Sequence, residues 1–210
     1  MTPEQFATSA PISPQSLHDY QIWEQQLQKW NARINLVAPN SLPDFWSRHA
    51  LDSAQIVPHI PDHATTIVDF GSGAGFPGLA IAIAAKHKNS DQTVHLLESS
   101  GKKSSFLKSV SRETGLNTVV HAKRIEAVPS LQADCITARA FAPLHRLLPL
   151  AALHLKPGGQ LVLLKGERVD DELETVSEDW SFEVEKQPSL SNESGCILIL
   201  RGLRPVSRET

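Results

Sequence analysis

The chain has 210 residues, of which 40% are hydrophobic and 20% are charged, and its formal net charge is −3. This length predicts one domain of ordinary size, and the composition excludes a largely disordered chain. The negative balance argues against a polyanion partner, but residues 167–186 alone carry −7, which leaves +4 on the rest. A chain polarised in this way can present a basic face, although the acidic run itself is typical of a solvated helix face.

No apolar stretch is long enough to span a bilayer, and the amino-terminal residues lack the basic start and apolar run of a secretory signal. Cys135 and Cys196 lie in apolar segments without partner spacing, which indicates free thiols in a reducing compartment. The nine histidines show no metal-ligand spacing; His59 and His63 are four apart but Pro61 intervenes. We therefore expect a cytoplasmic protein that needs no metal and no membrane, and we take a monomer as the expected state.

Residues 1–62 predict a helical extension. Ser13 is a suitable N-cap and Pro14 suits the first helical position. A second helix is predicted between Ser41 and Pro58, where prolines break the chain. The first helix carries one apolar stripe at steps of three and four, formed by Leu17, Tyr20, Trp23, Leu27, Trp30 and Ile34.

Residues 63–210 alternate short apolar strands with helices, which predicts a mostly parallel sheet covered on both faces. The last two apolar segments have no helix between them, so we expect an antiparallel C-terminal hairpin. The predicted fold class is therefore α/β, with the helical extension placed on a Rossmann-like, doubly wound sheet. Strands are expected at 65–70, 93–98, 118–125, 134–141, 158–166, 181–188 and 195–203, and helices at 77–88, 102–115 and 144–155, with Pro149 kinking or splitting the last.

A glycine-rich loop in "VDFGSGAGFPGLAIAIA" (68–84) joins the first strand to the first helix of the sheet. Gly71, Gly73 and Gly75 permit positive φ and remove side chains where a ligand must approach the backbone. Loops at the carboxyl ends of parallel strands are where open sheets bind ligands. We therefore predict a ligand site at this loop.

The loop also narrows the class of ligand. A nucleoside triphosphate loop needs a lysine and a hydroxyl where Phe76 and Pro77 stand. A nicotinamide dinucleotide loop prefers G-x-G-x-x-G, whereas this loop reads G-x-G-x-G and follows Asp69. An acid in that position suits a ligand with an ammonium group and a positive centre, such as S-adenosylmethionine.

Two later strand ends fit the same ligand. Glu98 closes the second strand, where a carboxylate accepts hydrogen bonds from two ribose hydroxyls. Ile125 could cover an adenine face, with Glu126 or adjacent backbone near its amino edge. Together these features predict a class I methyltransferase with S-adenosylmethionine as cofactor.

The sequence resembles one family closely over residues 31–167. The segments "FWSRHALDS" (45–53) and "TARAFAPL" (137–144) are the most specific. The order of all matching segments is that of the RsmG (GidB) family, bacterial enzymes that make 7-methylguanine in the 530 loop of 16S ribosomal RNA. The other matching segments are "NLVAP" (35–39), "VDFGSGAGFPGLAIAIA" (68–84), "LLESSGKKSSFL" (96–107), "RIE" (124–126) and "LLKGE" (163–167).

The resemblance implies a function and a set of contacts. Substrate would be 16S rRNA or a small ribosomal subunit particle. Glu98 stands where family members often carry Asp, and Thr137 replaces a more usual serine before the arginine. By the same resemblance, the methyl donor contacts Gly71, Phe76, Ile125, Glu126 and Arg139.

Methyl transfer to guanine N7 uses a ring lone pair that carries no proton. No general base is then required, and we expect no catalytic residue in that sense; catalysis comes from alignment and from a site that tolerates positive charge. Arg139 and Lys165 are the positioning candidates because both end strands at the rim that carries the glycine loop. Arg139 could hold the donor carboxylate or an RNA phosphate in forked geometry.

Positive side chains must hold the RNA. Lys102 and Lys103 could equally be solvated lysines, His49 could be a half-buried structural histidine, and Asp52 is predicted to pair with Arg48 along a helix. The candidate RNA contacts are Arg48, His49, Lys102, Lys103 and Lys165.

The sequence leaves two alternative functions open. A nicotinamide-dependent oxidoreductase shares the broad fold but is disfavoured by the loop spacing and by Asp69. A non-catalytic RNA-binding or ribosome-associated module would keep the fold without the chemistry, and the intact loop speaks against it.

Overall fold

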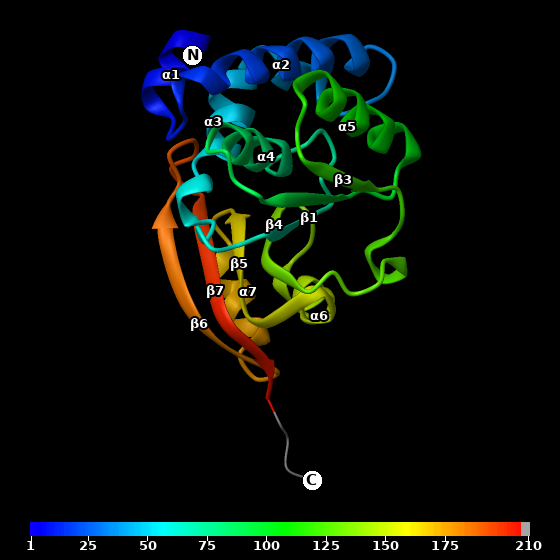
Figure 1. The fold of residues 1–210 in the computed structure, drawn as a ribbon. Helices are drawn as coiled ribbons and strands as arrows, with labels where there is room; N and C mark the ends of the chain where they lie inside the picture. Colours follow the sequence, from blue (N-terminus) through cyan, green and yellow to red (C-terminus); the bar gives the residue numbers. More distant parts are fainter. Residues whose placement is uncertain (207–210) are drawn as a thin grey trace.

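A seven-stranded sheet runs through the molecule in the order β3-β2-β1-β4-β5-β7-β6 (Figure 1). The computed structural model describes residues 1–206. The order reverses next to β1, which brings the ends of β1 and β4 together at the switch point where open sheets bind ligands. The strands are β1 (Thr66–Phe70), β2 (Thr93–Leu97), β3 (Thr118–His121), β4 (Ala133–Arg139), β5 (Leu155–Lys165), β6 (Trp180–Pro188) and β7 (Cys196–Pro205).

Strands β1 to β5 are parallel, whereas β7 is antiparallel to both β5 and β6. In the register of the central pair, Asp69 lies beside Thr137 and Phe70 beside Ala138. The central strands β1 and β4 are buried almost throughout, because helices cover the sheet on both sides. The predicted mostly parallel sheet with an antiparallel C-terminal hairpin is confirmed.

The helices divide between the two faces of the sheet. Helices α4 and α5 share one apolar cluster with the amino-terminal helices, and α6 and α7 contribute to a second cluster across the sheet. The helical elements that follow β1 are α4 (Gly78–His87), α5 (Gly101–Thr114), the short turn η5 (Ile125–Ala127), α6 (Leu144–His154) and α7 (Val169–Val176).

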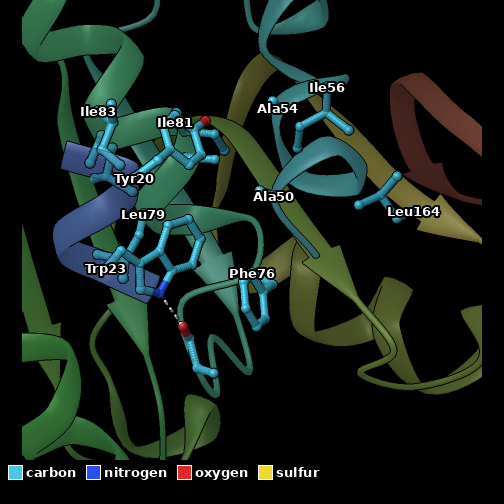
Figure 2. Packing of buried hydrophobic residues seen from close by; sticks show 14 of the residues in the cluster. Tyr20, Trp23, Ala50, Ala54, Ile56, Phe76, Leu79, Ile81, Ile83 and Leu164 are labelled. Carbon is cyan, nitrogen blue, oxygen red and sulfur yellow. Dashed lines mark hydrogen bonds between the residues drawn. The ribbon is translucent and has the colours of Figure 1, made fainter. Parts of the chain in front are cut away.

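The amino-terminal helices lie over α4 and the glycine loop (Figure 1). Trp23 donates its indole N–H to the carbonyl oxygen of Ala74 in that loop at 3.0 Å (Figure 2). Phe45 and Phe76 pack around the same indole ring. The extension therefore shares its core with the sheet domain and supports the loop directly. Its elements are α1 (Pro3–Ser9), η1 (Pro14–Ser16), α2 (Leu17–Asn31), η2 (Pro39–Asp44), η3 (Phe45–Ala50), α3 (Leu51–Ala54) and η4 (Val57–His59).

Several predicted boundaries were wrong. Pro14 begins a 3₁₀ turn and α2 starts only at Leu17, and Ser13 makes no side-chain cap. The strand predicted over 118–125 ends at His121, because the chain turns before Ile125 enters η5. Helix α6 continues through Pro149. Helix α1 was not predicted.

Candidate active site

A cavity of about 300 Å³ opens at the carboxyl ends of β1 and β2. It brings together four of the residues predicted for the cofactor, namely Gly71 of the loop, Glu98, Ile125 and Glu126. Ile125 and Glu126 reach it from η5, with Ile125 mostly buried and Glu126 exposed. Five lining residues were not predicted as site residues, namely Leu97, Ser99, Lys123, Arg124 and Phe141.

The glycines of the loop serve different purposes. Gly71 has φ +65°, and a Cβ there would lie 2.6 Å from the Phe141 ring. A Cβ on Gly75 would lie 2.3 Å from the side chain of Leu79, so Gly75 permits packing inside the protein. Gly73 has φ +55° and room around it. Of the three predicted glycines, Gly71 alone lines the cavity, so the bare backbone faces a ligand at one position and not at three.

Asp69 lies beneath the loop and not at its surface. The residue is fully buried, and its carboxylate accepts hydrogen bonds from Thr137 Oγ1 at 2.8 Å and from the Gly78 amide at 3.3 Å. Burial raises the pKa of Asp69 to about 6 despite these hydrogen bonds. The predicted attraction to a ligand's ammonium group therefore has no direct geometric support, and Asp69 ties the loop to β4 and α4.

Glu98 has the position and partners expected of a fixed acceptor. One of its oxygens accepts the Gly73 amide at 3.0 Å and the other the Ser100 amide at 2.7 Å, and the residue remains 8% exposed. Each carboxylate oxygen can accept more than one hydrogen bond. Two backbone amides thus hold the carboxylate in one orientation at the cavity wall while leaving acceptor capacity.

Arg139 lines a second cavity, of about 610 Å³. Its Nη2 donates to His49 Nδ1 at 2.8 Å, and its Nη1 lies 3.1 Å from Asp52 Oδ2 in an ion pair without hydrogen-bond geometry. The guanidinium also lies over the Phe76 ring, 5.1 Å from its centroid. Arg48 lines the same cavity. The positioning candidate Arg139 is therefore held from three sides at the end of β4.

Phe76 is largely buried within this cluster. Its ring stacks on His49 with centroids 4.8 Å apart and lies against Trp23 on the other helix. Neither of the two cavities is lined by Phe76. A cofactor contact at Phe76 would therefore come from its main chain, and the side chain supports Arg139.

His49, predicted as an RNA contact, is buried in the structure, and its surroundings favour the neutral imidazole. It is 5% exposed, and burial together with Arg139 and Arg48 lowers its pKa to about 4. Since Nδ1 accepts from the guanidinium, the proton lies on Nε2, which donates to Ser41 Oγ at 3.1 Å. Its role is to orient Arg139.

The buried His49 and Asp69 predict opposite dependences of stability on pH. Between pH about 4 and 6.5, His49 is protonated in the unfolded chain but not in the fold, so its contribution to stability is lost as pH falls. Between pH 3.8 and about 6, Asp69 is protonated in the fold but not in the unfolded chain, so its contribution is lost as pH rises.

We therefore expect the slope of the free energy of unfolding against pH, between pH 4 and 6, to be more negative in His49→Gln than in the wild type and more positive in Asp69→Asn. Urea denaturation at each pH measures both slopes. Slopes parallel to that of the wild type in both variants would contradict the burial argument.

The predicted helical pair of Arg48 with Asp52 does not form. Residues 45–50 follow a π-helix, whose wider turn moves residues four apart out of register. Arg139 takes the carboxylate instead, and Arg48 is exposed with no ion pair among residues 1–206.

Lys165, predicted as an RNA contact and as a positioning residue, has internal partners in the structure. Its ammonium group donates to Glu172 Oε2 at 2.6 Å and to the Ala142 carbonyl at 3.1 Å, and its side chain is 9% exposed. Glu172 also accepts the Leu144 amide at 2.8 Å. Lys165 and Glu172 thus fix the segment after β4, in which Ala140 has φ +48°.

Removal of this ion pair should cost stability. We expect Lys165→Met to lower the free energy of unfolding by about 1–3 kcal/mol, because the variant leaves the Glu172 carboxylate and the Ala142 carbonyl without their donor. Chemical denaturation measures the change. Arg201→Met, which removes a half-exposed cation paired with Glu185, is the control and should cost under about 1 kcal/mol. Equal losses in both variants would contradict this role for Lys165.

Lys102 and Lys103 stand in the first turn of α5, which is capped by Ser100. Lys102 is exposed and Lys103 half-buried, and neither makes an ion pair in the described part of the chain. Within residues 1–206, no three His, Cys, Asp or Glu side chains are grouped closely enough to hold a metal ion. Among those residues no helix has the length and apolar content to cross a bilayer.

Comparison with known proteins decides the family. Residues 16–199 match the model of the GidB family, described as rRNA small subunit methyltransferase G. The chain belongs to this family. A ribosomal RNA small subunit methyltransferase G from Paramagnetospirillum magneticum is 45% identical over 96% of both chains. One from Rhodospirillum rubrum is 45% identical over 94% of this chain and 96% of its own.

Solved structures of other proteins resemble this family member in fold. M. jannaschii TYW2 in complex with AdoMet superimposes with a TM-score of 0.57 at 14% identity, covering 83% of this chain and 80% of that one. The tRNA (m1A58) methyltransferase TrmI from Aquifex aeolicus gives 0.52 at 13% identity, covering 75% and 69%. Similarity at this level shows the class I methyltransferase fold alone.

Proposed function

We propose that this protein transfers the methyl group of S-adenosylmethionine to N7 of a guanine in the 530 loop of 16S ribosomal RNA. Membership of the rRNA small subunit methyltransferase G family supports the cofactor and the class of substrate. The particular nucleotide rests on the resemblance of the sequence to the RsmG family. The observation that carries the cofactor assignment is the carboxylate of Glu98, fixed by two amides at the wall of the 300 Å³ cavity.

The cavity fits the adenosine part of such a ligand. Glu98 retains acceptor capacity for two ribose hydroxyls, and Gly71 presents bare backbone beside it. Ile125 offers an apolar face to the adenine ring, and Glu126 lies next to it. Bound there, the cofactor supplies an electrophilic methyl group on a positively charged sulfur.

The residues of this chain act by position and charge. Guanine N7 has no proton to lose, so no side chain has to accept one, and the neutral His49 is occupied by Arg139. We place the RNA at the cavity lined by Arg139 and Arg48, where the guanidinium is held by Asp52, His49 and Phe76. Such preorganisation aligns the reacting atoms before transfer.

Transfer of labelled methyl tests this function. The purified protein, methyl-tritiated S-adenosylmethionine and either naked 16S rRNA or small-subunit particles should yield labelled 7-methylguanosine in the 530 loop. Both substrates are needed because the natural one is either free RNA or an assembling particle. Absence of label on both, or a labelled nucleoside other than 7-methylguanosine, would contradict the proposal.

A further inference from the structure

A basic groove lies between α2 and α5, outside both cavities of the candidate active site. Its volume is about 760 Å³. Four cationic side chains and one acidic side chain line it, a net of +3 in a chain whose formal charge is −3. The groove is lined by Gln26, Lys29, Trp30, Arg33, Ile34, Lys102, Ser105, Ser109, Arg112 and Glu113.

The four cations of this groove have no protein partners. Within residues 1–206, no ion pair or side-chain hydrogen bond involves Lys29, Arg33, Lys102 or Arg112. The one acid, Glu113, is engaged by the amide of Gln26 from α2. Some exposed cations elsewhere are paired, as the ion pairs of Lys186 with Asp170 and of Arg201 with Glu185 show, whereas others such as Arg48 make no ion pair among residues 1–206. The positive charge of the groove is therefore available to an anion from outside.

The cations of the groove come from both of its sides. Lys29 lies in the last turn of α2 and Arg33 follows the end of that helix at Asn31, whereas Lys102 and Arg112 lie in the first and last turns of α5. The acids of residues 167–186 lie on other elements, around and after α7. Because four cations and only one acid line the groove, its charge indicates a ligand with several negative charges.

The floor of the groove is aromatic. Trp30 is partly exposed there, its indole N–H donates to Gln26 Oε1 at 3.0 Å, and its ring meets Phe106 edge to face. A fixed aromatic surface flanked by lysines and arginines suits a nucleic acid strand, whose phosphates pair with the cations and whose bases stack on rings. A purely phosphate ligand would have no use for the ring.

Helix α5 connects the groove to the cofactor cavity. The helix starts directly after Glu98 and Ser99 of the cavity wall, and Lys102 in its first turn lines the groove. Arg112 in its last turn lies about 15 Å further along, at about 1.5 Å per residue. An RNA whose target base enters the active site could therefore extend along this helix.

We propose that the α2–α5 groove is a docking site for an RNA strand that flanks the methylated nucleotide. Its cations neutralise backbone phosphates and Trp30 offers a stacking surface, while the chemistry takes place at the rim of the sheet. The assignment of 16S rRNA as that strand rests on the proposed function.

The test compares two double variants with equal loss of charge. Lys29→Gln with Arg33→Gln removes a lysine and an arginine from the groove, and Lys88→Gln with Arg204→Gln removes the same pair from exposed positions elsewhere. We expect the groove variant to raise the KM for 16S rRNA about tenfold with unchanged kcat and S-adenosylmethionine affinity. The slope of log Kd for RNA against log salt should fall by about 1.4–1.8, or 0.7–0.9 per lost contact.

The outcomes separate the alternatives. The control pair should match the wild type in RNA binding. The groove variant should keep the wild-type stability, because Lys29 and Arg33 make no ion pair or side-chain hydrogen bond within residues 1–206. Equal RNA binding by the two double variants would contradict the proposal that the groove binds RNA. If the groove variant bound small-subunit particles more weakly but bound naked rRNA as the wild type does, the groove would contact a ribosomal protein. That result would also contradict the proposed RNA docking site. A wild-type protein that methylates no rRNA, yet binds RNA through the groove, would refute the proposed function and leave the groove standing.

Discussion

Replacement of Arg139 by alanine should lower kcat/KM for methyl transfer by at least about 100-fold, which is about 2.7 kcal/mol of transition-state stabilisation. The guanidinium ends β4 beside the glycine loop, and His49, Asp52 and Phe76 fix its direction. We propose that it holds the donor's carboxylate or an RNA phosphate while N7 approaches the methyl group. Arg139→Lys should also be poorly active, because an ammonium group lacks the planar fork.

The loss of activity should exceed the loss of stability. Alanine leaves Asp52 without its cation, which costs about 1–3 kcal/mol in unfolding free energy and leaves the protein folded at 25 °C. Steady-state kinetics, chemical denaturation and S-adenosylmethionine binding, measured on the same preparations, separate the loss of catalysis from the losses of stability and of cofactor affinity. A folded Arg139→Ala protein with the kcat/KM of the wild type would contradict the proposed role of Arg139 in methyl transfer.

Replacement of Glu98 by alanine should raise the dissociation constant for S-adenosylmethionine by at least about 100-fold. Two hydrogen bonds to a charged acceptor are lost, each with a net value of about 1.5–3 kcal/mol. The carboxylate also organises the loop through the Gly73 and Ser100 amides, so the variant loosens the cavity wall. Isothermal titration calorimetry measures the change.

Glu98→Gln makes the test more specific. The amide keeps one oxygen acceptor and the side-chain volume, so we expect an intermediate affinity between those of the wild type and the alanine variant. Glu126→Gln, at an exposed residue that lines the same cavity, is the matched control and should weaken cofactor binding less than Glu98→Gln. Unchanged affinity in both Glu98 variants would contradict the ribose assignment.

The elements of the sheet could be predicted because their signals are local. Apolar strands, the helix closed by Gly115 and the missing helix before β7 all appear in the sequence pattern. Helix α1 was missed although Thr2 and Gln5 form a capping box across its first turn, a pattern that was available. The start of α2 was misplaced because Pro14 favours the first turn of either helix type.

The candidate site was only partly predictable because its contacts join distant segments. Glu98 and Ile125 could be located from strand ends and loop spacing alone. The partners of Arg139 could not, since His49 and Asp52 lie 90 and 87 residues away in the sequence. His49 also lies on a π-helical stretch that no periodicity signals, and Asp52 lies in α3 directly after it. The specific segment "TARAFAPL" could have indicated Phe141.

Charge in the sequence does not show which cations have internal partners. Lys165 ends β5 and His49 lies on η3, and burial gives both of them internal partners. Which cations stay free is decided by the tertiary positions of acids such as Glu172, and a sequence does not contain those positions directly.

A crystal structure with S-adenosylmethionine tests the central claim most directly. We predict electron density for the cofactor in the cavity lined by Gly71, Glu98 and Ile125, with both ribose hydroxyls on the Glu98 carboxylate and the methyl group directed toward the side of Arg139. Cofactor bound elsewhere on the protein, or a saturated crystal whose cavity contains only solvent, would contradict the account.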